Sequence, residues 1–241
     1  MSRGAALRAL HHGRAAGDPL VLPGPWDAAS ARVFAEAGFP ALATPSEGVS
    51  AALGYADGQH TPVEEMFAAV ARVVRAVDVP VTADVEAGYG LPAKELAERL
   101  LEIGAAGCNL EDSDPATRRL RDPGEQADYL AAVREAAGDA LVVNARIDTF
   151  LRGDRTLAAA VARGRRYAEA GADCLYPITA PPELLADLAE ATGLPVNALC
   201  RPGGPSPREL GGFGATRVTF GGGLHHQALD AVREMARGLL A

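Results

Sequence analysis

The chain has 241 residues and a formal net charge of −8 at neutral pH, with 48% hydrophobic, 22% charged and 5% aromatic residues. This length corresponds to one large domain, and the composition is ordinary for a soluble globular protein with a core large enough to need no disulfide. The negative charge disfavours nucleic acid and anionic membranes as partners, although an acidic protein can still bind anions locally.

Cysteine usage and the N-terminal segment predict a cytoplasmic protein. The three cysteines, Cys108, Cys174 and Cys200, lie in or beside apolar runs, which indicates reduced core residues. Residues 1–17 lack the long apolar run of a secretory signal, and we expect this segment to be helical or extended. No run in the chain approaches the roughly 20 apolar residues of a membrane helix.

Eight short runs of strand-like composition occur along the chain. Several are continuous apolar stretches, which is typical of strands buried on both faces of a parallel sheet. In chain order the runs are Leu20–Gly24, Ala41–Ser46, Val79–Glu86, Gly107–Asp112, Ala140–Ile147, Cys174–Ile178, Pro195–Cys200 and Arg217–Gly222.

The segments between these runs have helical patterns. Thr61–Glu65 combines a Thr N-cap, a proline at the first helical position and acids in the first turn, and apolar residues then follow at helical spacing to Ala76. Further helices are expected to begin at Leu91–Glu95 and Ala180–Glu183. Four predicted α-to-β turns carry a glycine suited to the left-handed residue that ends a helix: Gly38, Gly104, Gly171 and Gly214.

Alternating strands and helices predict a parallel sheet, and a count of eight predicts that it closes into a single (β/α)₈ barrel, a TIM barrel, over residues 1–241. A doubly wound open sheet is the alternative. That fold would normally show a glycine-rich phosphate fingerprint after the first strand, and Pro23-Gly24-Pro25-Trp26 is not one.

Polar side chains gather where three successive strands are expected to end, which is where barrel enzymes carry their sites. Side chains alternate across a strand, so members of each group share one face. The groups are Thr82, Asp84 and Glu86 from the third strand, Asn109 and Glu111 from the fourth, and Asn144, Arg146 and Asp148 from the fifth.

Buried carboxylates cost several kcal/mol unless they are paired or bind a metal. Oxygen ligands without His or Cys suit Mg²⁺ or Mn²⁺, so Asp84, Glu86 and Glu111 are the predicted metal ligands. Arg146 could hold a carboxylate or phosphonate, and the metal could stabilise an enolate beside a C–C or C–P bond. The alternative is a structural polar layer in which Arg146 pairs with Glu111 and Glu86.

Other residues near the predicted strand ends are further candidates. Asp27 is predicted to be a helix N-cap, and a role in the site, next to Trp26, is the second possibility. Asp57 is predicted to be a turn residue. Ser46 and the neighbouring backbone of Glu47 and Gly48 could bind an oxyanion. His225 and His226 are predicted to be surface or packing residues, and Gly221–Gly223 resembles a barrel phosphate site. The polar loop Ser113–Gly124, with Arg118, Arg119 and Arg121, is a candidate lid.

These motifs resemble the isocitrate lyase/phosphoenolpyruvate mutase superfamily. The similarity runs from about Leu20 to the end of the chain, and its most specific part is Asp84-Val85-Glu86-Ala87-Gly88-Tyr89-Gly90 followed by Glu111-Asp112. Further matching segments are Leu22–Ala31, Leu53–Gly58 and Asn144–Asp148.

The resemblance implies a (β/α)₈ barrel that binds Mg²⁺ and a 2-oxo acid or its enolate. It implies that Asp84, Glu86 and Glu111 form the metal shell, directly or through water, and that Arg146 contacts the substrate carboxylate. Asp57 matches an acid that helps bind the metal or acts on the substrate, and Trp26, Asp27, Ser46, Glu47, Gly48, Asn109 and Asn144 are the expected substrate-binding residues. It also implies a homodimer or homotetramer that exchanges its C-terminal helix.

The chain departs from the best-known branches of that superfamily. The Lys-Lys-Cys-Gly-His motif of isocitrate-type lyases is missing, and the loop after Glu111 is short and carries arginines. Glu47 stands where a small residue is usual, and Gly24 where Asn is usual. The leading prediction is a Mg²⁺-dependent lyase acting on a small 2-oxo acid. The alternatives are a phosphonate mutase or hydrolase of the carboxyphosphonoenolpyruvate or phosphonopyruvate type, and a non-catalytic barrel that binds metal and oxo acid.

Overall fold

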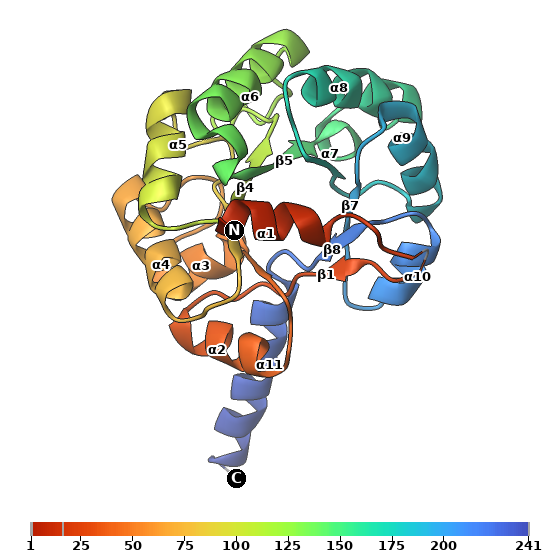
Figure 1. Cartoon of the computed structure of the whole chain (residues 1–241). Helices are drawn as coiled ribbons and strands as arrows, with labels where there is room; N and C mark the ends of the chain where they lie inside the picture. The colour runs from red at the N-terminus through yellow and green to blue at the C-terminus, as the bar shows by residue number, and fades with distance from the viewer. Residues whose placement is uncertain (1, 16, 241) are drawn as a thin grey trace.

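The computed structural model describes residues 2–15 and 17–240, and eight parallel strands form a ring at its centre (Figure 1). Each strand lies inside one of the eight predicted runs. The strands are β1 Leu20–Val21, β2 Leu42–Thr44, β3 Val81–Asp84, β4 Gly107–Glu111, β5 Val142–Ile147, β6 Cys174–Pro177, β7 Asn197–Leu199 and β8 Arg217–Thr219.

Most of the helices surround this ring on the outside, whereas α1 lies across its end and α11 projects away from it (Figure 1). In chain order the helices are α1 Arg3–Leu10, α2 Ala28–Glu36, α3 Ser46–Leu53, α4 Val63–Arg75, α5 Ala93–Glu102, α6 Pro123–Ala137, α7 Thr149–Arg152, α8 Leu157–Glu169, α9 Leu185–Thr192, α10 Pro207–Gly212 and α11 Gly223–Gly238. Two short 3₁₀ helices, η1 Gly138–Ala140 and η2 Pro182–Leu184, precede β5 and α9. No helix within the described residues is long and apolar enough to span a membrane.

The strands pair in parallel in the orders β2-β3-β4-β5-β6 and β1-β8-β7. Two backbone contacts join these groups into a closed ring. A parallel bridge between Leu175 and Val196 links β6 to the residue before β7, and the Ala43 N–H donates to the Pro23 carbonyl at 3.1 Å. The predicted TIM barrel is therefore confirmed, and an open doubly wound sheet is excluded.

Helix α1 closes the end of the barrel at which the strands begin, and it lies across the middle of the ring in Figure 1. Its Leu7 is fully buried among side chains from inside the barrel, including Leu20 and Val142. Arg8 fixes the helix in place, because its guanidinium donates to Asp173 at 2.7 Å and to the Leu141 carbonyl at 2.8 Å. The predicted helical or extended N-terminal segment thus contains a helix that packs against the barrel.

Local predictions of helix ends agree with the structure in most places. All four predicted turn glycines have positive φ, between 77° and 100°. Asp27 caps α2 through a reciprocal capping box with Ser30. At α4, however, Pro62 rather than Thr61 is the N-cap, because the Thr61 hydroxyl donates to Ser50 in the core instead.

Two helices begin directly where strands end and were not predicted. Helix α3 starts at Ser46, inside the run predicted to be a strand to that residue, and α7 starts at Thr149 after β5. The third strand was also predicted too long. It ends at Asp84, and Glu86 has a φ of 50°, so strand alternation does not place its side chain.

Candidate functional site

A cavity of about 290 Å³ opens where the strands end, on the side of the barrel away from α1. Its volume is at the lower end of the range for small-molecule pockets. Five predicted site residues line it, and so does the candidate phosphate turn Gly221–Gly223. The five are Ser46, Glu47, Asp57, Asp84 and Arg146, and most of the remaining wall comes from residues in and after β6, β7 and β8, including Tyr176, Ile178, Leu199, Arg201 and Phe220.

Asp84 is the last residue of β3, and its carboxylate lies at the cavity wall. Its Oδ1 accepts the Glu86 backbone N–H at 3.1 Å. Burial raises the pKa of Asp84 above its ordinary value, and the nearby Arg146 charge opposes this rise without cancelling it. A buried carboxylate with so little compensation is better satisfied by a cation than by the groups already present.

The turn after β3 positions Glu86 through an unusual backbone conformation. Glu86, Gly88, Tyr89 and Gly90 all have positive φ, and a Cβ on Gly88 would lie 2.5 Å from the Tyr129 hydroxyl oxygen. Such strain concentrates at functional sites. The Glu86 side chain is buried and accepts the Tyr89 hydroxyl at 2.8 Å, and burial raises its pKa to about 7.

Glu111 and Arg146 face each other on adjacent strands, because β4 and β5 pair with these two residues in register. Arg146 Nη1 lies 2.5 Å from Glu111, and its Nε lies 2.7 Å from the fully buried Asp148. Burial raises the pKa of Glu111 to about 8 despite this arginine, because neighbouring acids add to the effect. The structural alternative predicted that Arg146 pairs with Glu111 and Glu86. The pair with Glu111 is present, but the second partner is Asp148, because the Glu86 carboxylate accepts Tyr89 instead.

The donor set fits a hard divalent cation, but its members do not surround one point. Within residues 2–15 and 17–240, no three His, Cys, Asp or Glu side chains lie close enough together to hold a metal ion. Asp84 and Asp57 line the cavity, whereas Glu86 and Glu111 do not. This division suits a metal that contacts some acids directly and others through water, as Mg²⁺ commonly does.

A polar layer lies one step deeper in the barrel. Asn144 donates to Asn109 at 2.7 Å, and the same Asn109 oxygen is 3.3 Å from Nη2 of Arg217. Arg217 is fully buried, and its Nε and Nη1 have no hydrogen-bond partner in the described part of the chain. This arginine places a fixed positive charge beneath the acids.

The predicted site residues thus separate into two groups. Asn109 and Asn144 lie in the deeper layer and do not line the cavity. Trp26 packs against His225, with ring centroids 5.1 Å apart, and Asp27 caps α2, so both lie outside the cavity wall. Gly48 is buried, and a Cβ there would lie 3.0 Å from the Pro45 side chain. Their roles as substrate-binding residues stay predictions.

The candidate lid does not lie over the cavity in this structure. None of residues 113–124 is part of the cavity wall, and the last two of them, Pro123 and Gly124, already belong to α6. The loop is tied back instead: the Ser113 hydroxyl donates to Asp148 at 2.5 Å, and Ser113 pairs with Leu120 in a short antiparallel bridge. The arginines at 118 and 119 are exposed.

Several cavity residues escaped the sequence reasoning because they are apolar or lie beyond a strand end. Tyr176 and Leu199 belong to β6 and β7, whose alternation would have placed them inside the barrel. Arg201 follows β7 in a loop with no periodic pattern. For Arg201 the only indication in the sequence is its position two residues after β7.

The sequence profile of the family described as phosphoenolpyruvate phosphomutase matches residues 7–240. The chain belongs to this family. It is therefore an enzyme of the isocitrate lyase/phosphoenolpyruvate mutase superfamily, whose members are lyases and mutases that act on small oxo acids.

Proteins similar to this chain carry names from both branches, the mutases and the lyases. A Burkholderia cenocepacia J2315 structure, described provisionally as a phosphonomutase, is 42% identical with a TM-score of 0.90, covering 98% of this chain and 99% of that one. The structure of a 2,3-dimethylmalate lyase is 26% identical with a TM-score of 0.85, covering 99% and 88%. The 2-methylisocitrate lyase of Bacillus subtilis is 32% identical over 66% of this chain, which spans about 55% of that lyase.

Proposed function

We propose that this member of the family is a Mg²⁺-dependent lyase that cleaves or forms a C–C bond next to a 2-oxo acid or a related carboxylate, through an enolate. The proposal is carried by the buried acids with raised pKa values, Asp84, Glu86 and Glu111, beside a small cavity at the strand ends. Manganese suits the same oxygen donors.

Each part of the site has a role in this proposal. Asp84 and Asp57, which line the cavity, would hold the metal directly. Glu86 and Glu111, which do not line it, would accept hydrogen bonds from water molecules bound to the metal. When bound, Mg²⁺ supplies Lewis-acid stabilisation of the negative charge that develops on the substrate oxygen. Arg146, held by Glu111 and Asp148, presents its positive charge at the cavity and would face the substrate carboxylate.

The 113–124 loop gives no support to phosphonate chemistry. Its arginines were the predicted phosphonate-recognition group, and none of them lines the cavity. We therefore expect no turnover of phosphonopyruvate, observed as an unchanged phosphorus NMR spectrum. A new phosphate or phosphonate resonance would instead support the mutase or hydrolase reaction.

Binding of Mg²⁺ with oxalate, an enolate mimic, tests the site directly. Together they should raise the melting temperature, because a ligand at a hundred times its Kd stabilises the folded state by about 2.7 kcal/mol. Asp84→Asn should lose this effect, whereas Asp128→Asn, at an exposed position on α6, should keep it. If millimolar Mg²⁺ and oxalate leave the melting temperature of the natural chain unchanged, the proposed metal site does not exist.

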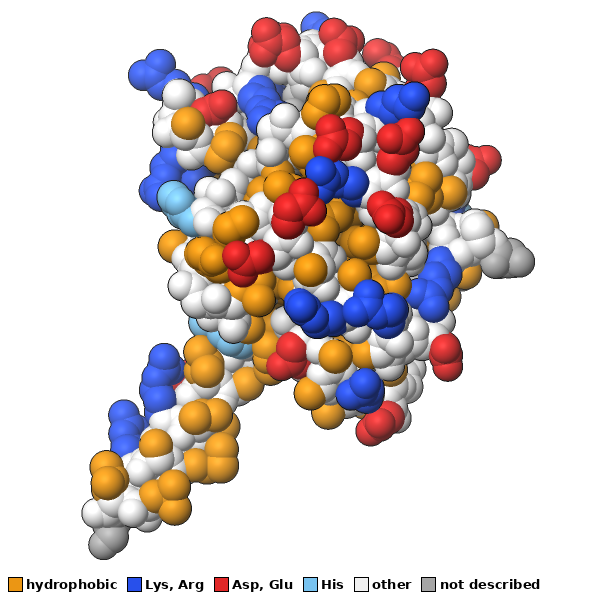
Figure 2. Space-filling model, turned by 90° about the vertical axis from the view of Figure 1, so that its left-hand side faces the viewer, with side chains coloured by type: hydrophobic (Ala, Val, Ile, Leu, Met, Phe, Trp, Pro, Cys, Tyr) orange, Lys and Arg blue, Asp and Glu red, His pale blue; other side chains and the backbone are white. Residues whose placement is uncertain are grey.

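We also propose that the protein is a homo-oligomer in which α11 packs on a neighbouring copy. Figure 2 shows this helix extending from the barrel with apolar side chains along it. Val232 and Met235 are 52% and 62% exposed, and Leu239 and Leu240 are 88% and 91% exposed. Such an apolar strip is typical of an interface. Replacing Val232 and Met235 with serine should shift the mass measured by light scattering to that of the monomer, and an unchanged mass would reject this role.

A further inference from the structure

The cavity contains a second arginine, Arg201, which the proposed reaction does not yet use. It lies in the loop between β7 and α10, is exposed, and lines the cavity. Over residues 2–15 and 17–240, its side chain makes no hydrogen bond or ion pair with the protein. An unpaired guanidinium at the wall of a small cavity is available to bind an anion.

Arg201 faces the acids from the opposite side of the barrel. Asp84 ends β3, and Arg201 follows β7, which is four strands away in a closed ring of eight. Arg146, the other cavity arginine, is already engaged by Glu111 and Asp148. Of the two cavity arginines, Arg201 is therefore the one whose positive charge has no carboxylate partner among the described residues.

Part of the wall between these two sides is apolar. Ile178, Leu199 and Phe220 form it, beside the polar side chains of Tyr176, Ser46 and Glu47. A ligand that reaches from the acids to Arg201 would therefore have a polar, metal-binding end, a short apolar middle and an anionic far end. A cavity of about 290 Å³ restricts such a ligand to a small molecule.

Glu47 favours a carboxylate over a phosphonate as that anionic end. Its carboxylate lies against the glycine turn after β8, where a Cβ on Gly222 would come within 2.4 Å of the Glu47 Oε2. The other carboxylate oxygen is 3.3 Å from Nε2 of His226 at the start of α11. The Glu47 carboxyl group thus occupies the space against the glycine turn and the start of α11, where a phosphoryl group would otherwise bind, and it disfavours a dianion there more than a monoanion.

We propose that Arg201 is a specificity residue that binds a carboxylate at the end of the substrate remote from the metal-binding 2-oxo acid, so that the preferred substrates are dicarboxylates. This inference rests on the proposed function, because it takes the acid side of the cavity to be the place where the 2-oxo acid is held.

Calorimetry with matched acids in the presence of Mg²⁺ tests the role of Arg201. Oxaloacetate is compared with 2-oxobutanoate, and 2-oxoglutarate with 2-oxopentanoate, since each pair has the same chain length and differs in the far carboxylate. We expect the dicarboxylate of at least one pair to bind at least tenfold more tightly, which corresponds to about 1.4 kcal/mol. Arg201→Met should remove this preference and leave oxalate binding unchanged, and Arg201→Lys should retain part of it.

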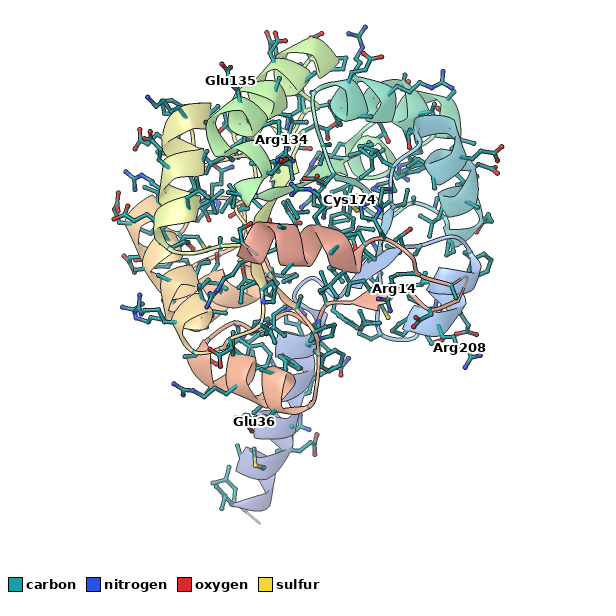
Figure 3. The ribbon with its side chains drawn as sticks, viewed as in Figure 1. Arg14, Glu36, Arg134, Glu135, Cys174 and Arg208 are labelled. Carbon is teal, nitrogen blue, oxygen red and sulfur yellow. The ribbon has the colours of Figure 1, made fainter. Side chains whose placement is uncertain are left out.

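A matched control comes from α10, where Figure 3 shows Arg208 at the outer edge of the molecule. Arg208→Met should keep the natural preference. If Arg201→Met keeps it too, or if the natural chain shows no preference while binding oxalate with Mg²⁺, the role of Arg201 is refuted and the metal site stands. If oxalate with Mg²⁺ does not bind the natural chain, the proposed function fails and this inference with it. Phosphonopyruvate binding more tightly than oxaloacetate would overturn the choice of a carboxylate.

Discussion

Replacing Glu111 with glutamine should separate a metal site from a structural ion pair. Glu111 contacts Arg146 at 2.5 Å. If this contact were a structural ion pair, Glu111 would be a buried, ionised carboxylate. Its pKa of about 8, raised mainly by burial, instead means that it carries a proton in the metal-free protein at pH 6. Glutamine has nearly the same shape as the protonated acid. In the unfolded chain Glu111 is ionised at pH 6, so folding must take up this proton and glutamine avoids that cost. The substitution should therefore stabilise the metal-free protein at pH 6, by about 2 kcal/mol at about 1.4 kcal/mol for each pH unit above 4.5.

The size of the effect at higher pH follows from linkage. The folded-state pKa of Glu111 lies above its ordinary value of 4.5, so its contribution to stability is present below pH 4.5 and is lost as the pH rises to about 8. At about 1.4 kcal/mol for each pKa unit, ionising this buried group costs on the order of 3 to 5 kcal/mol. The Glu111→Gln variant avoids this cost and should be the more stable protein at pH 9 without metal.

Urea unfolding of both proteins in a chelator, at pH 6 and pH 9, measures this difference. Adding Mg²⁺ and oxalate at pH 8 should then stabilise the natural chain and leave the variant unchanged, and the variant should have no turnover. A loss of more than about 3 kcal/mol at pH 6 would refute the reasoning, because that is the cost of breaking a buried ion pair by removing one partner. Glu111 and Arg146 would then form the structural polar layer.

Three further predictions concern the same end of the barrel. Mg²⁺ affinity measured by calorimetry should increase from pH 6 to pH 8 with release of protons, because the raised pKa values of the acids make protons compete with the metal; affinity that is independent of pH would contradict this. Asp112→Asn should cost about 3 kcal/mol in urea unfolding, since the buried Asp112 accepts Arg163 at 3.0 Å, and a change below about 0.5 kcal/mol would show that the pair is unimportant. Gly88→Ala should destabilise the protein by about 1 to 3 kcal/mol and weaken Mg²⁺ binding, because the added Cβ meets Tyr129. Gly90→Ala is the control and should cost less, because no atom lies near its added Cβ. Equal losses of stability in the two variants would mean that only backbone strain matters.

The barrel was predictable because its elements follow local rules. Buried strands need continuous apolar runs, and helices followed by strands need a residue that adopts positive φ, which is why Gly38, Gly104, Gly171 and Gly214 could be identified. The ends of strands were less predictable. Helix α3 begins at Ser46 within a run of strand-like residues, because chain geometry at the end of a strand depends on neighbouring loops rather than on local composition.

The candidate site was predictable where strand alternation holds and not where it stops. Glu111 and Arg146 lie within β4 and β5, and their predicted proximity is confirmed by the register. Glu86 lies in a turn and has a positive φ. The direction of its side chain therefore follows from the turn, and the alternation of side chains along a strand does not predict it. Arg201 could not be assigned, because its position depends on how a loop returns over the barrel.

The interior of the barrel is filled with side chains, to which α1 adds Leu7, and this packing has a kinetic consequence. Among the residues that the structure describes, the cavity at the strand ends has no passage through the barrel, so reactants and products enter and leave on the same side. A molecule that enters last must leave first, and the one nearest the floor is trapped until the others depart. If the metal lies deepest, products should leave in a fixed order, and the first to leave should inhibit noncompetitively against the substrate.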